Sequence, residues 1–589
     1  MTSSPPPRPT SDDEQSLGFA PQRGMSLWLS PSLLLHAALR VVISSVLGEY
    51  TDKREQMAAL PEPAVHDYSR ADELWFDYVS DLGDGFAATY AMASLLARPQ
   101  LDLGGPTNRG TFLVMGGDQC YPTASTTGYE DKAVGPYRAA LPWVDGEQPG
   151  LYVLPGNHDW YDGLTSFMRM FCQGSSVGGW RTEQTRSYFA VRLPHHWWLL
   201  GIDIQFDSYI DDAQRRYFAK VAEQLGPDDA VILCSAKPSW IGGTDESPET
   251  YAVLDYFERT IIRSTGASVR VSLSGDRHHY ARYAEQGGTG QKFTAGGGGA
   301  YLSPTHHLPP TLVLPPAASR AIGKTSPPAT YTLQQTFPDA PTSRRLGLGI
   351  FRLPFQTRGL AALFGGLYLA LALAIGGSAA PRGRAVGDHL RDMAAALRTS
   401  SVNDLFAGLG RSFPALLLCL LFLGSAVAFT KASRTPKGIV VGLVHGALHL
   451  VAAVLVLAGL LALVHGLHGL WLALVFAPVL VVVGGLVGTE LVAGYLLLAD
   501  RLLDLNANEL FAAQARPDYK NLLRLHLGPD GVLTVYPVKV ERVPRRWRLV
   551  PDGATTDPWF APTDRALLFD LIESPLRIPQ REPGGGAGR

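Results

Sequence analysis

The chain has 589 residues, which at roughly 100 to 200 residues per domain implies three or more structural units. The net charge of −2 at pH 7 shows no basic excess, and this argues against nucleic acid as a main partner. The four cysteines have no paired or CxxC spacing, which argues against a disulfide framework and favours a reducing compartment.

The N-terminal part is predicted to hold two segments outside any folded domain. Residues 1–24 are rich in Pro and Ser and lack the apolar core of a signal peptide, so they predict a disordered tail. Residues 25–69 begin with an apolar run that is interrupted by Pro31, His36 and Arg40. We expect an amphipathic, membrane-proximal helix there, with a fifth spanning helix as the alternative.

Residues 70–302 alternate short β-rich runs with helical patterns. The predicted strands are LWFDYVSD, TFLVMGGD, LYVLPGNHD, WWLLGIDI, AVILCSA and VRVSLSGD. Between several of them lie segments with helical spacing of apolar residues, such as DDAQRRYFAKVAEQL and ETYAVLDYFERTIIRS. This alternation predicts an α/β domain with a largely buried sheet.

The middle of the chain is predicted to be a linker followed by a membrane domain. Residues 303–356 are rich in Pro, Thr and Ser and predict an extended linker. Residues 357–500 contain four apolar runs, each with about the 20 residues that cross a bilayer. The runs lie at 359–380, 413–430, 438–466 and 470–499. We therefore predict an integral, multi-pass membrane protein with an α-helical membrane domain of four spans.

Basic residues near these runs predict the orientation of the membrane domain. The loop KASRTPK and the two flanks, on the side shared with both soluble parts, carry nine Lys and Arg residues. The opposite side carries five arginines in its first loop, at 382, 384, 391, 398 and 411, and neither Lys nor Arg in the turn HGLHG. The positive-inside rule therefore places the soluble domains in the cytoplasm. For the ionisable residues in or near the runs, hydrogen bonding between helices is favoured over a functional role; they are His445, His449, His465 and Glu490.

The C-terminal part is predicted to be a cytoplasmic β-rich segment at 501–575 with a flexible tail at 576–589. In the stretch KNLLRLHLGPDGVLTVYPVKVERVPRRWRL, a PDG turn separates two alternating runs. This pattern predicts a β-hairpin or a small sheet.

Four of the predicted strands end in polar signatures, at the edge where open α/β sheets place ligands. The signatures are VSDLGDG at 79–85, GGDQCYP at 116–122, LPGNHDW at 154–160 and SGDRHHY at 274–280. They offer carboxylates, an amide oxygen, a phenol and imidazoles from different strands. Such a mixed set of oxygen and nitrogen atoms predicts a site for one or two hard or borderline metal ions.

The order DLG, GDQCY, GNHD, GDRHHY resembles the calcineurin-like metallophosphoesterase superfamily. Tyr121, three residues after Asp118, resembles the purple acid phosphatase branch. The resemblance covers residues 70–302 and not the membrane region. It implies a metallophosphoesterase-type β-sandwich flanked by helices, and a hydrolase that acts on phosphate esters.

The resemblance also implies a ligand set for two divalent or mixed-valence metal ions, Mn, Fe or Zn. Asp81 and His278 would bind one metal, Asp118 would bridge both, and Asn157 with Asp276 would serve the second. Tyr121 as a phenolate favours ferric iron, and a packed aromatic that supports the loop is the alternative.

Further roles are implied for the residues around these ligands. His158 would stand beside the substrate and protonate the leaving oxygen, with Asp159 orienting its ring or serving as a plain turn residue. Lys237, His279 and Arg282 are the candidates for binding the substrate.

Three positions depart from the family pattern. Gly83 stands where many relatives have a ligand, Lys237 where a histidine is expected, and Asp276 where the last motif has its first histidine. A protonated lysine is repelled by a cation. The second metal site therefore stays open. One alternative is a histidine such as His279 or His306 that completes the site, and the other is a weak or absent site in which Lys237 supplies positive charge for phosphate.

The function expected from these observations is a membrane-anchored, metal-dependent phosphohydrolase that cleaves a phosphomonoester or phosphodiester by metal-activated water. Its expected partners are a phosphorylated small molecule or lipid head group, and a membrane. A tetraglycine at 296–299 predicts either backbone amides that take an anionic oxygen or a flexible hairpin. The alternative function is a catalytically weak relative that senses a ligand and signals through its membrane helices. The sequence leaves the oligomeric state open.

Overall fold

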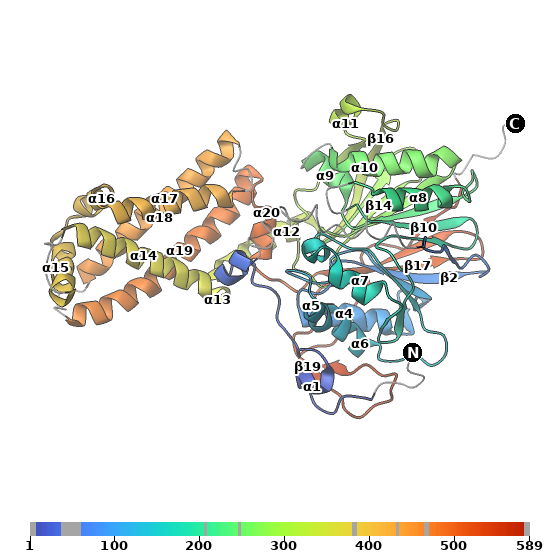
Figure 1. Cartoon of the computed structure of the whole chain (residues 1–589), viewed down its shortest axis with the longest axis horizontal. Coiled ribbons are helices and arrows are strands. Elements are labelled where there is room, and N and C mark those ends of the chain that lie inside the picture. Colours follow the sequence, from blue (N-terminus) through green and yellow to red (C-terminus); the bar gives the residue numbers. More distant parts are fainter. Residues whose placement is uncertain are drawn as a thin grey trace. The chain divides into compact units, whose positions relative to one another are not determined.

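The computed structural model describes residues 7–36, 61–204, 209–245, 249–379, 386–430, 435–463 and 470–581. The described chain forms two compact units (Figure 1). The first unit holds the described residues up to Ser26, from 61 to Ser343 and from Arg516 onward, and the second holds Leu27–His36 and Arg344–Ala515. The first unit is therefore assembled from segments on both sides of the apolar region.

The first unit contains two sheets of nine described strands each. The first sheet has the order β21-β18-β17-β2-β5-β6-β8-β7, with β22 paired to β18. Its strands are β2 (Leu74–Val79), β5 (Phe112–Met115), β6 (Gly150–Val153), β7 (Ser176–Val177), β8 (Trp180–Thr182), β17 (Lys520–Leu527), β18 (Leu533–Val540), β21 (Asp570–Leu571) and β22 (Leu576–Ile578). The neighbours β2, β5 and β6 run parallel.

The second sheet has the order β1-β9-β10-β11-β12-β14-β13-β16-β15. Its strands are β1 (His66–Asp67), β9 (Phe189–Arg192), β10 (Trp197–Ile202), β11 (Ala230–Ser235), β12 (Ser268–Ser274), β13 (Tyr280–Glu285), β14 (Gln291–Ala295), β15 (Thr311–Leu314) and β16 (Ala329–Phe337). Here β10, β11 and β12 run parallel. All six strands expected from the apolar runs are therefore confirmed, as β2, β5, β6, β10, β11 and β12.

The core lies between the two sheets, where Phe76 and Val114 of the first meet Ile232 and Leu273 of the second. Helices cover both outer faces (Figure 1). They are α4 (Phe86–Ala97), α6 (Gly135–Ala140) and α7 (Thr165–Phe171) on the first sheet, and α8 (Asp212–Ala222) and α10 (Glu249–Phe257) on the second. Because both faces are buried, strands such as β10 consist of one continuous apolar run. The expected sandwich flanked by helices is confirmed.

The region after residue 302 differs from its prediction. It contains β15, α11 (Ala317–Ile322) and β16, and β16 pairs with both β13 and β15. The prediction of an extended linker is therefore wrong for these elements. The Thr-rich composition that suggested a linker also suits a strand, since β-branched residues favour extended backbone.

The C-terminal segment forms the expected hairpin, β17 with β18, but it does not stand apart. Strand β17 pairs with β2 across five residues, from Leu523 opposite Tyr78 to Leu527 opposite Leu74. In the second residue pair the Arg524 guanidinium forms an ion pair with Asp77 at 2.8 Å, and both side chains are buried. The segment thus belongs to the first sheet of the first unit.

This ion pair gives a measurable test of the sheet. Asp77→Leu leaves Arg524 buried and without its carboxylate, so we expect the free energy of unfolding of the first unit to fall by about 3 to 5 kcal/mol. The double variant Asp77→Leu with Arg524→Leu removes both charges and should recover most of the loss. Urea unfolding followed by tryptophan fluorescence measures both. Equal losses in the single and double variants would contradict a paired, buried contact.

The two N-terminal predictions have different outcomes. Within residues 7–24, Arg8 donates to the carbonyl oxygens of Val550 and Pro558, each at 2.8 Å, and Phe19 is buried. The prediction of a disordered tail is therefore wrong for these residues. Of the helix predicted within 25–69, residues 31–36 are helical, and 37–60 lie outside the described residues. The predicted tail at 576–589 begins with strand β22 instead, and 582–589 lie outside the described residues.

The second unit is helical, and among the described residues three helices are long and apolar enough to cross a membrane. These are α14 (Arg358–Ala379), α18 (Pro436–Leu463) and α19 (Leu470–Leu503). A fourth span is formed only if α16 (Val402–Arg411) and α17 (Phe413–Phe429), which meet at 91°, count together. Alone, α17 has 17 residues and a length of about 25 Å, short of a bilayer core. Four predicted spans are compatible with this arrangement, and the sidedness stays a prediction.

The remaining α-helices and strands of the described chain lie between or beside these elements. They are α1 (Glu14–Leu17), β3 (Gln100–Asp102), β4 (Pro106–Asn108), α5 (Thr126–Tyr129), α9 (Ser239–Asp245), α12 (Ala340–Leu346), α13 (Leu353–Gln356), α15 (Val386–Thr399), α20 (Ala507–Ala512), β19 (Trp547–Leu549) and β20 (Phe560–Pro562).

Candidate active site

The loops that follow parallel strands of both sheets bring the predicted polar residues together. Asp81 follows β2 and Asp118 follows β5 in the first sheet, whereas Asp276 and His278 follow β12 in the second. The two loops of the first sheet are tied by their backbones, because the Asp81 N–H donates to the Gly117 carbonyl at 2.9 Å. The site therefore lies at the carboxyl edge of both sheets, as the sequence predicts.

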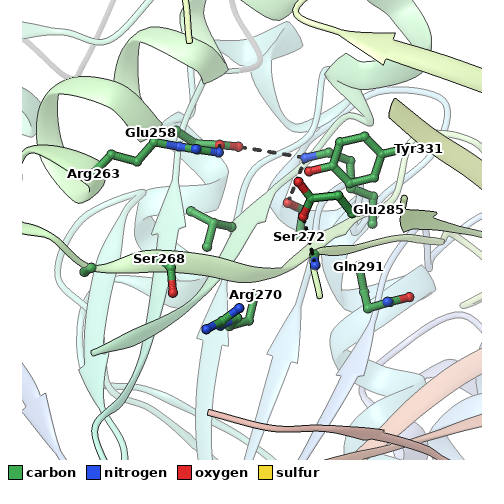
Figure 2. A pocket seen from close by; sticks show the side chains of 12 residues that line it. Glu258, Arg263, Ser268, Arg270, Ser272, Glu285, Gln291 and Tyr331 are labelled. Carbon is green, nitrogen blue, oxygen red and sulfur yellow. Dashed lines mark hydrogen bonds and ion pairs between the residues drawn. The ribbon is translucent and has the colours of Figure 1, made fainter. Parts of the chain in front are cut away.

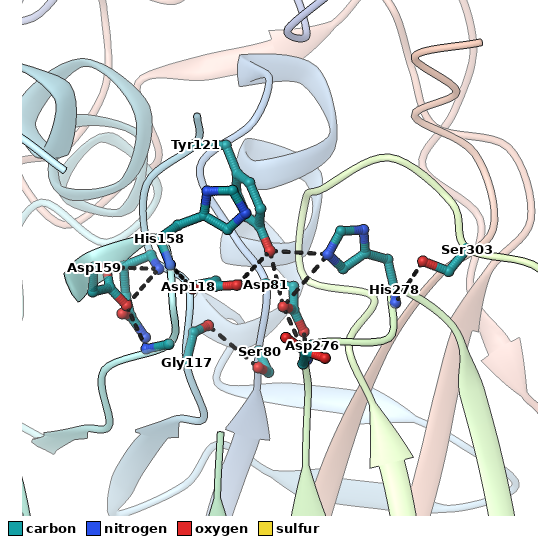
Figure 3. A network of polar contacts seen from close by, with 12 residues as sticks. Ser80, Asp81, Gly117, Asp118, Tyr121, His158, Asp159, Asp276, His278 and Ser303 are labelled. Carbon is teal, nitrogen blue, oxygen red and sulfur yellow. Dashed lines mark hydrogen bonds and ion pairs between the residues drawn. The ribbon is translucent and has the colours of Figure 1, made fainter. Parts of the chain in front are cut away.

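The hydroxyl of Tyr121 is the common point of contact in this site (Figure 3). Its Oη lies 2.9 Å from Asp81 Oδ1, 3.1 Å from Asp118 Oδ2 and 2.9 Å from His278 Nε2. A hydroxyl has one proton and an ionised carboxylate has none, so these contacts cannot all be hydrogen bonds at once. A cation would satisfy the carboxylates, the phenol oxygen and the imidazole nitrogen together.

The three aspartates of the site share an unusual backbone conformation. Asp81, Asp118 and Asp276 have φ values of 60°, 51° and 64°, in the left-handed region. Aspartate enters this region more readily than most residues, but the conformation is uncommon outside glycine. Strain of this kind persists where the surrounding structure fixes it, and it is often found at functional sites.

Glycines stand where the two central carboxylates need room. A Cβ atom added at Gly156 would lie 2.0 Å from Asp118 Oδ1, and one added at Gly296 would lie 2.5 Å from Asp81 Oδ2. Both distances are far shorter than a non-bonded contact, so alanine at either position must displace the carboxylate. The glycine of the GNHD motif is therefore required by the side chain it contacts.

Burial and mutual repulsion disfavour negative charge in this cluster. Burial raises the pKa of Asp118 to about 8, and the charge of Asp276 adds to this effect. Burial also raises the pKa of Asp81, with further contributions from both other aspartates. Burial and the neighbouring carboxylates raise the pKa of Tyr121 as well, so its hydroxyl keeps its proton. Carboxylates held this closely need a proton or a metal ion between them.

His158 is held beside the cluster by two backbone contacts. Its N–H donates to Asp118 Oδ1 at 2.8 Å, and its Nδ1 lies 2.7 Å from the carbonyl oxygen of Pro122. Because a carbonyl only accepts, Nδ1 carries the proton and Nε2 is the nitrogen that exchanges a second one. Burial lowers the pKa of His158, so the ring is neutral at pH 7. Figure 3 shows the ring of His158 beside that of Tyr121.

The prediction that Asp159 orients the ring of His158 is wrong. The Asp159 carboxylate accepts from the Gly156 N–H at 2.8 Å and from the Tyr129 hydroxyl at 2.6 Å. It therefore joins the loop after β6 to helix α5, which is a structural task. The orienting group for His158 is the Pro122 carbonyl, which no side-chain pattern in the sequence reveals.

Asn157, Asp276 and Lys237 flank the cluster. The Asp276 N–H donates to both oxygens of Asp81, at 3.1 and 2.9 Å, and the charge of its carboxylate raises the pKa of Asp118. Asn157 and Lys237 follow β6 and β11, at the same edge. Whether these residues hold a second metal ion stays a prediction.

Two residues predicted to bind the substrate are Arg282, whose side chain binds other residues of the chain, and His279, whose ring is uncharged. Arg282 forms a bidentate ion pair with Glu573, at 2.9 and 2.6 Å, and also donates to Gln291 at 3.0 Å. All three of its guanidinium nitrogens donate to these two residues, so the prediction that Arg282 binds the substrate is wrong. Burial and the charge of Arg277 lower the pKa of His279 to about 3, so this ring brings no positive charge to a phosphate.

The tetraglycine at 296–299 lies between β2 and the C-terminal strand β17. The Gly298 N–H donates to the Ser80 carbonyl at 2.8 Å, and the Asn521 N–H donates to the Gly297 carbonyl at 3.1 Å. The tetraglycine therefore packs against the loop that carries Asp81. The sequence predicted instead either backbone amides that bind an anionic oxygen or a flexible hairpin.

Lys520, at the start of β17, is the main residue that sequence reasoning missed. Its side chain is fully buried, and its Nζ has no hydrogen-bond partner among the described residues. Burial lowers its pKa to about 7, against the attraction of Asp518, Asp84 and Asp81. Burial also lowers the pKa of His278, and the charge of Lys520 lowers it further. Lys520 therefore places a positive charge near the cluster.

A separate polar cavity of about 120 Å³ lies on the outer side of the second sheet (Figure 2). Lys292 is buried beside it, 3.3 Å from Ser272 Oγ and 3.9 Å from Glu258 Oε1. The Arg263 guanidinium lies 3.4 Å from the same glutamate. Lys292 and Arg263 thus share Glu258 as their acidic partner, which indicates a structural cluster.

No protein-family model and no curated protein matches the chain. Among solved structures it is similar to GAP50, the anchor in the inner membrane complex of Plasmodium, with 12% identity and a TM-score of 0.30 over 39% of this chain and 74% of that one. It is also similar to the purple acid phosphatase PPD1 of yellow lupin (Lupinus luteus) seeds, with 13% identity and a TM-score of 0.31, over 42% of this chain and 48% of that one. A third similar structure is that of PhoD, with 14% identity and a TM-score of 0.24, over 41% of this chain and 59% of that one. Likenesses of this size carry no functional conclusion.

Proposed function

We propose that the protein is a membrane-anchored, metal-dependent phosphohydrolase that cleaves a phosphomonoester or a phosphodiester. The convergence of Asp81, Asp118 and His278 on the hydroxyl of Tyr121 carries the proposal. These side chains offer hard and borderline ligand atoms of the kind that Mn, Fe and Zn bind. Their buried carboxylates repel one another in the absence of a cation.

The ligand atoms suggest how the metal ions would be divided. Asp81, Tyr121 and His278 would hold the first ion, and Asp118 would be shared between the two ions. Asn157 and Asp276 would serve the second; a single ion is the alternative. When bound, the ions polarise the phosphate and activate a water molecule for in-line attack.

The remaining residues of the site handle protons and charge. The Pro122 carbonyl keeps one proton on Nδ1 of His158, so Nε2 gives a proton to the leaving oxygen only after it has taken up a second one. Lys520 and Lys237 contribute positive charge that favours binding of an anionic phosphate ester. Three apolar helices in the second unit support an anchored enzyme. We infer a cytoplasmic substrate, either a phosphorylated small molecule or a lipid head group.

The proposal is tested with the purified full-length chain in detergent. Aryl phosphate monoesters, aryl phosphate diesters and phospholipids are supplied with Mn²⁺, Zn²⁺ or Fe³⁺, and metal content is measured in the same preparation. Hydrolysis of one ester class, with one or two metal ions per chain, is the expected result. Metal binding without turnover of any substrate would favour a ligand sensor, and no metal binding at all would overturn both.

The proton donor is tested through the leaving group. His158→Ala removes Nε2, so we expect hydrolysis of an alkyl phosphate to slow by about 100-fold or more. Hydrolysis of a nitrophenyl ester, whose leaving oxygen needs no proton, should slow much less. The ratio of kcat/KM for the two esters, in the variant and the unchanged protein, is the measurement. His195→Ala is the matched control, because His195 contacts the backbone of Asp72 instead. Equal slowing of both esters would assign His158 a role other than acid.

A further inference from the structure

Two histidines form a chain of contacts among the apolar helices of the second unit. His445 and His449 lie one turn apart on α18, and both are buried, with exposed fractions of 5% and 2%. The Tyr368 Oη lies 3.2 Å from His449 Nδ1, and His449 Nε2 lies 3.2 Å from His445 Nε2. The contacts therefore run from the tyrosine through one ring into the other.

The chain of contacts ends on an atom without a partner. If Tyr368 donates to His449, then His449 Nε2 donates to His445 Nε2, and His445 Nδ1 carries a proton with no acceptor. If the direction is reversed, His445 Nδ1 is an acceptor with no donor. In both cases His445 Nδ1 has no hydrogen-bond partner among the described residues. An orphan polar atom in an apolar surrounding is unfavourable unless something occupies it.

Aromatic rings hold both imidazoles in place. The ring of His445 is stacked on that of Tyr495, with centroids 4.0 Å apart and planes at 2°. The ring of His449 is stacked on Phe364, with centroids 4.6 Å apart and planes at 5°. The Tyr495 hydroxyl is fixed in turn by Asn506 Oδ1 at 3.0 Å. The orphan nitrogen therefore has one fixed position, as in a preorganised binding site.

The two histidines line a cavity of about 360 Å³ within the second unit. This volume lies in the range of small-molecule sites, roughly 300 to 1,000 Å³. Apart from the histidines and one serine, the lining is apolar: Leu29, Leu34, Leu360, Leu363, Phe364, Leu367, Leu421, Phe422, Ala426, Phe429 and Val492. Three of these residues, Leu34, Leu363 and Leu421, are themselves exposed by 43%, 44% and 50%. The apolar lining of the cavity thus extends to apolar side chains on the surface of the second unit.

We propose that this cavity binds a long-chain lipid with a single neutral oxygen group, a hydroxyl or a carbonyl, whose oxygen hydrogen-bonds to His445 Nδ1. The apolar lining would bind the hydrocarbon chain of the lipid, and His445 Nδ1 would bind its oxygen group. A charged phosphate head group does not fit, because the lining offers no cation to pair with it. This site is independent of the proposed hydrolase chemistry of the first unit.

The test uses photolabelling of the full-length chain in phosphatidylcholine vesicles. The probe is a long-chain alcohol with a diazirine near the hydroxyl, and the matched probe is the alkane of the same length and diazirine position. We expect the alcohol to label peptides of α14, α17 and α18 about 5-fold more than the alkane does, the ratio of one hydrogen bond. His445→Phe should remove this preference and leave alkane labelling unchanged.

Controls separate binding from misfolding. Thr489→Val changes a buried polar residue of α19 that donates to the Gly485 carbonyl and does not line the cavity, so the preference should persist. His445→Asn retains a polar atom and should restore part of the preference. Equal labelling by alcohol and alkane in the unchanged protein would overturn the proposal, even if His445→Phe does not fold. Competition by an unlabelled alcohol but not by a ketone, or the reverse, identifies the head group.

Discussion

Asp118→Asn is expected to remove metal-dependent phosphate-ester hydrolysis and to make the metal-free protein more stable. Asp118 contacts Tyr121 through one carboxylate oxygen and the His158 N–H through the other, so it lies at the centre of the cluster. Loss of an outer contact to a metal ligand already costs about 10- to 100-fold in affinity or activity, and loss of the ligand itself should cost at least that. In the metal-free state the same change removes one of several buried, repelling carboxylates.

The measurement combines activity, metal content and thermal unfolding, with and without chelator. Chelator should lower the Tm of the unchanged protein far more than that of Asp118→Asn. Asp131→Asn is the control, since Asp131 is also buried but binds the Ala20 N–H and Arg23, outside the cluster. A variant that keeps both its metal and its activity would remove Asp118 from the ligand set.

Lys520→Met is expected to raise stability and lower activity. The ammonium of Lys520 is fully buried, and its pKa falls from 10.5 to about 7 in the folded state. At about 1.4 kcal/mol per pKa unit, the variant should be more stable by roughly 4 kcal/mol at pH 7. The same change removes a positive charge near Asp81, so we expect KM for an anionic substrate to rise. Urea unfolding and steady-state kinetics measure the two effects.

The pH dependence of this effect has a defined sign. Because the pKa of Lys520 is lower in the folded chain, the unfolded chain binds more protons between about pH 7 and 10.5. The contribution of Lys520 to stability therefore improves as pH rises through this window, and below about pH 7 its full penalty is present. The stability difference between Lys520→Met and the unchanged protein should shrink toward pH 10.

Lys539→Met serves as the control for this variant. Lys539 lies on the neighbouring strand β18 but is partly exposed and paired with Glu541 at 3.3 Å, so its removal should change stability little at any pH. A difference between Lys520→Met and the unchanged protein that stays constant from pH 7 to pH 10 would show that Lys520 is hydrated in the folded chain.

The central site was predictable because each of its pieces is local. Asp81, Asp118 and His278 each follow a short apolar strand within a few residues, and parallel strands place such residues at one edge. Lys520 has no such signal, because it is a single lysine before an apolar run, and its role depends on β17 pairing with a strand far away in the sequence. Proximity in sequence also misled, since Arg282 lies near the last motif but binds Glu573.

Composition failed where polar segments pack against distant parts of the chain. Residues 329–337 were predicted to be linker because of their Pro/Thr-rich surroundings, yet they complete the second sheet beside β13. The N-terminal tail is ordered in its described part because Arg8 binds carbonyl oxygens of the C-terminal segment. Neither the pairing of β16 with β13 nor the contacts of Arg8 leave a periodic pattern in the sequence, because both depend on residues that only the tertiary structure brings together.

The pairing of β17 with β2 imposes an order on biosynthesis. A ribosome that has made residues up to Ser343 has produced Asp81, Asp118 and His278, but not the strand that lies beside β2 or the lysine near the cluster. The whole apolar region must leave the ribosome before Lys520 does. Chains are made at about 5 to 20 residues per second, so the completed sheet trails the apolar helices by several seconds. The proposed hydrolase is therefore finished only after its anchor has been synthesised.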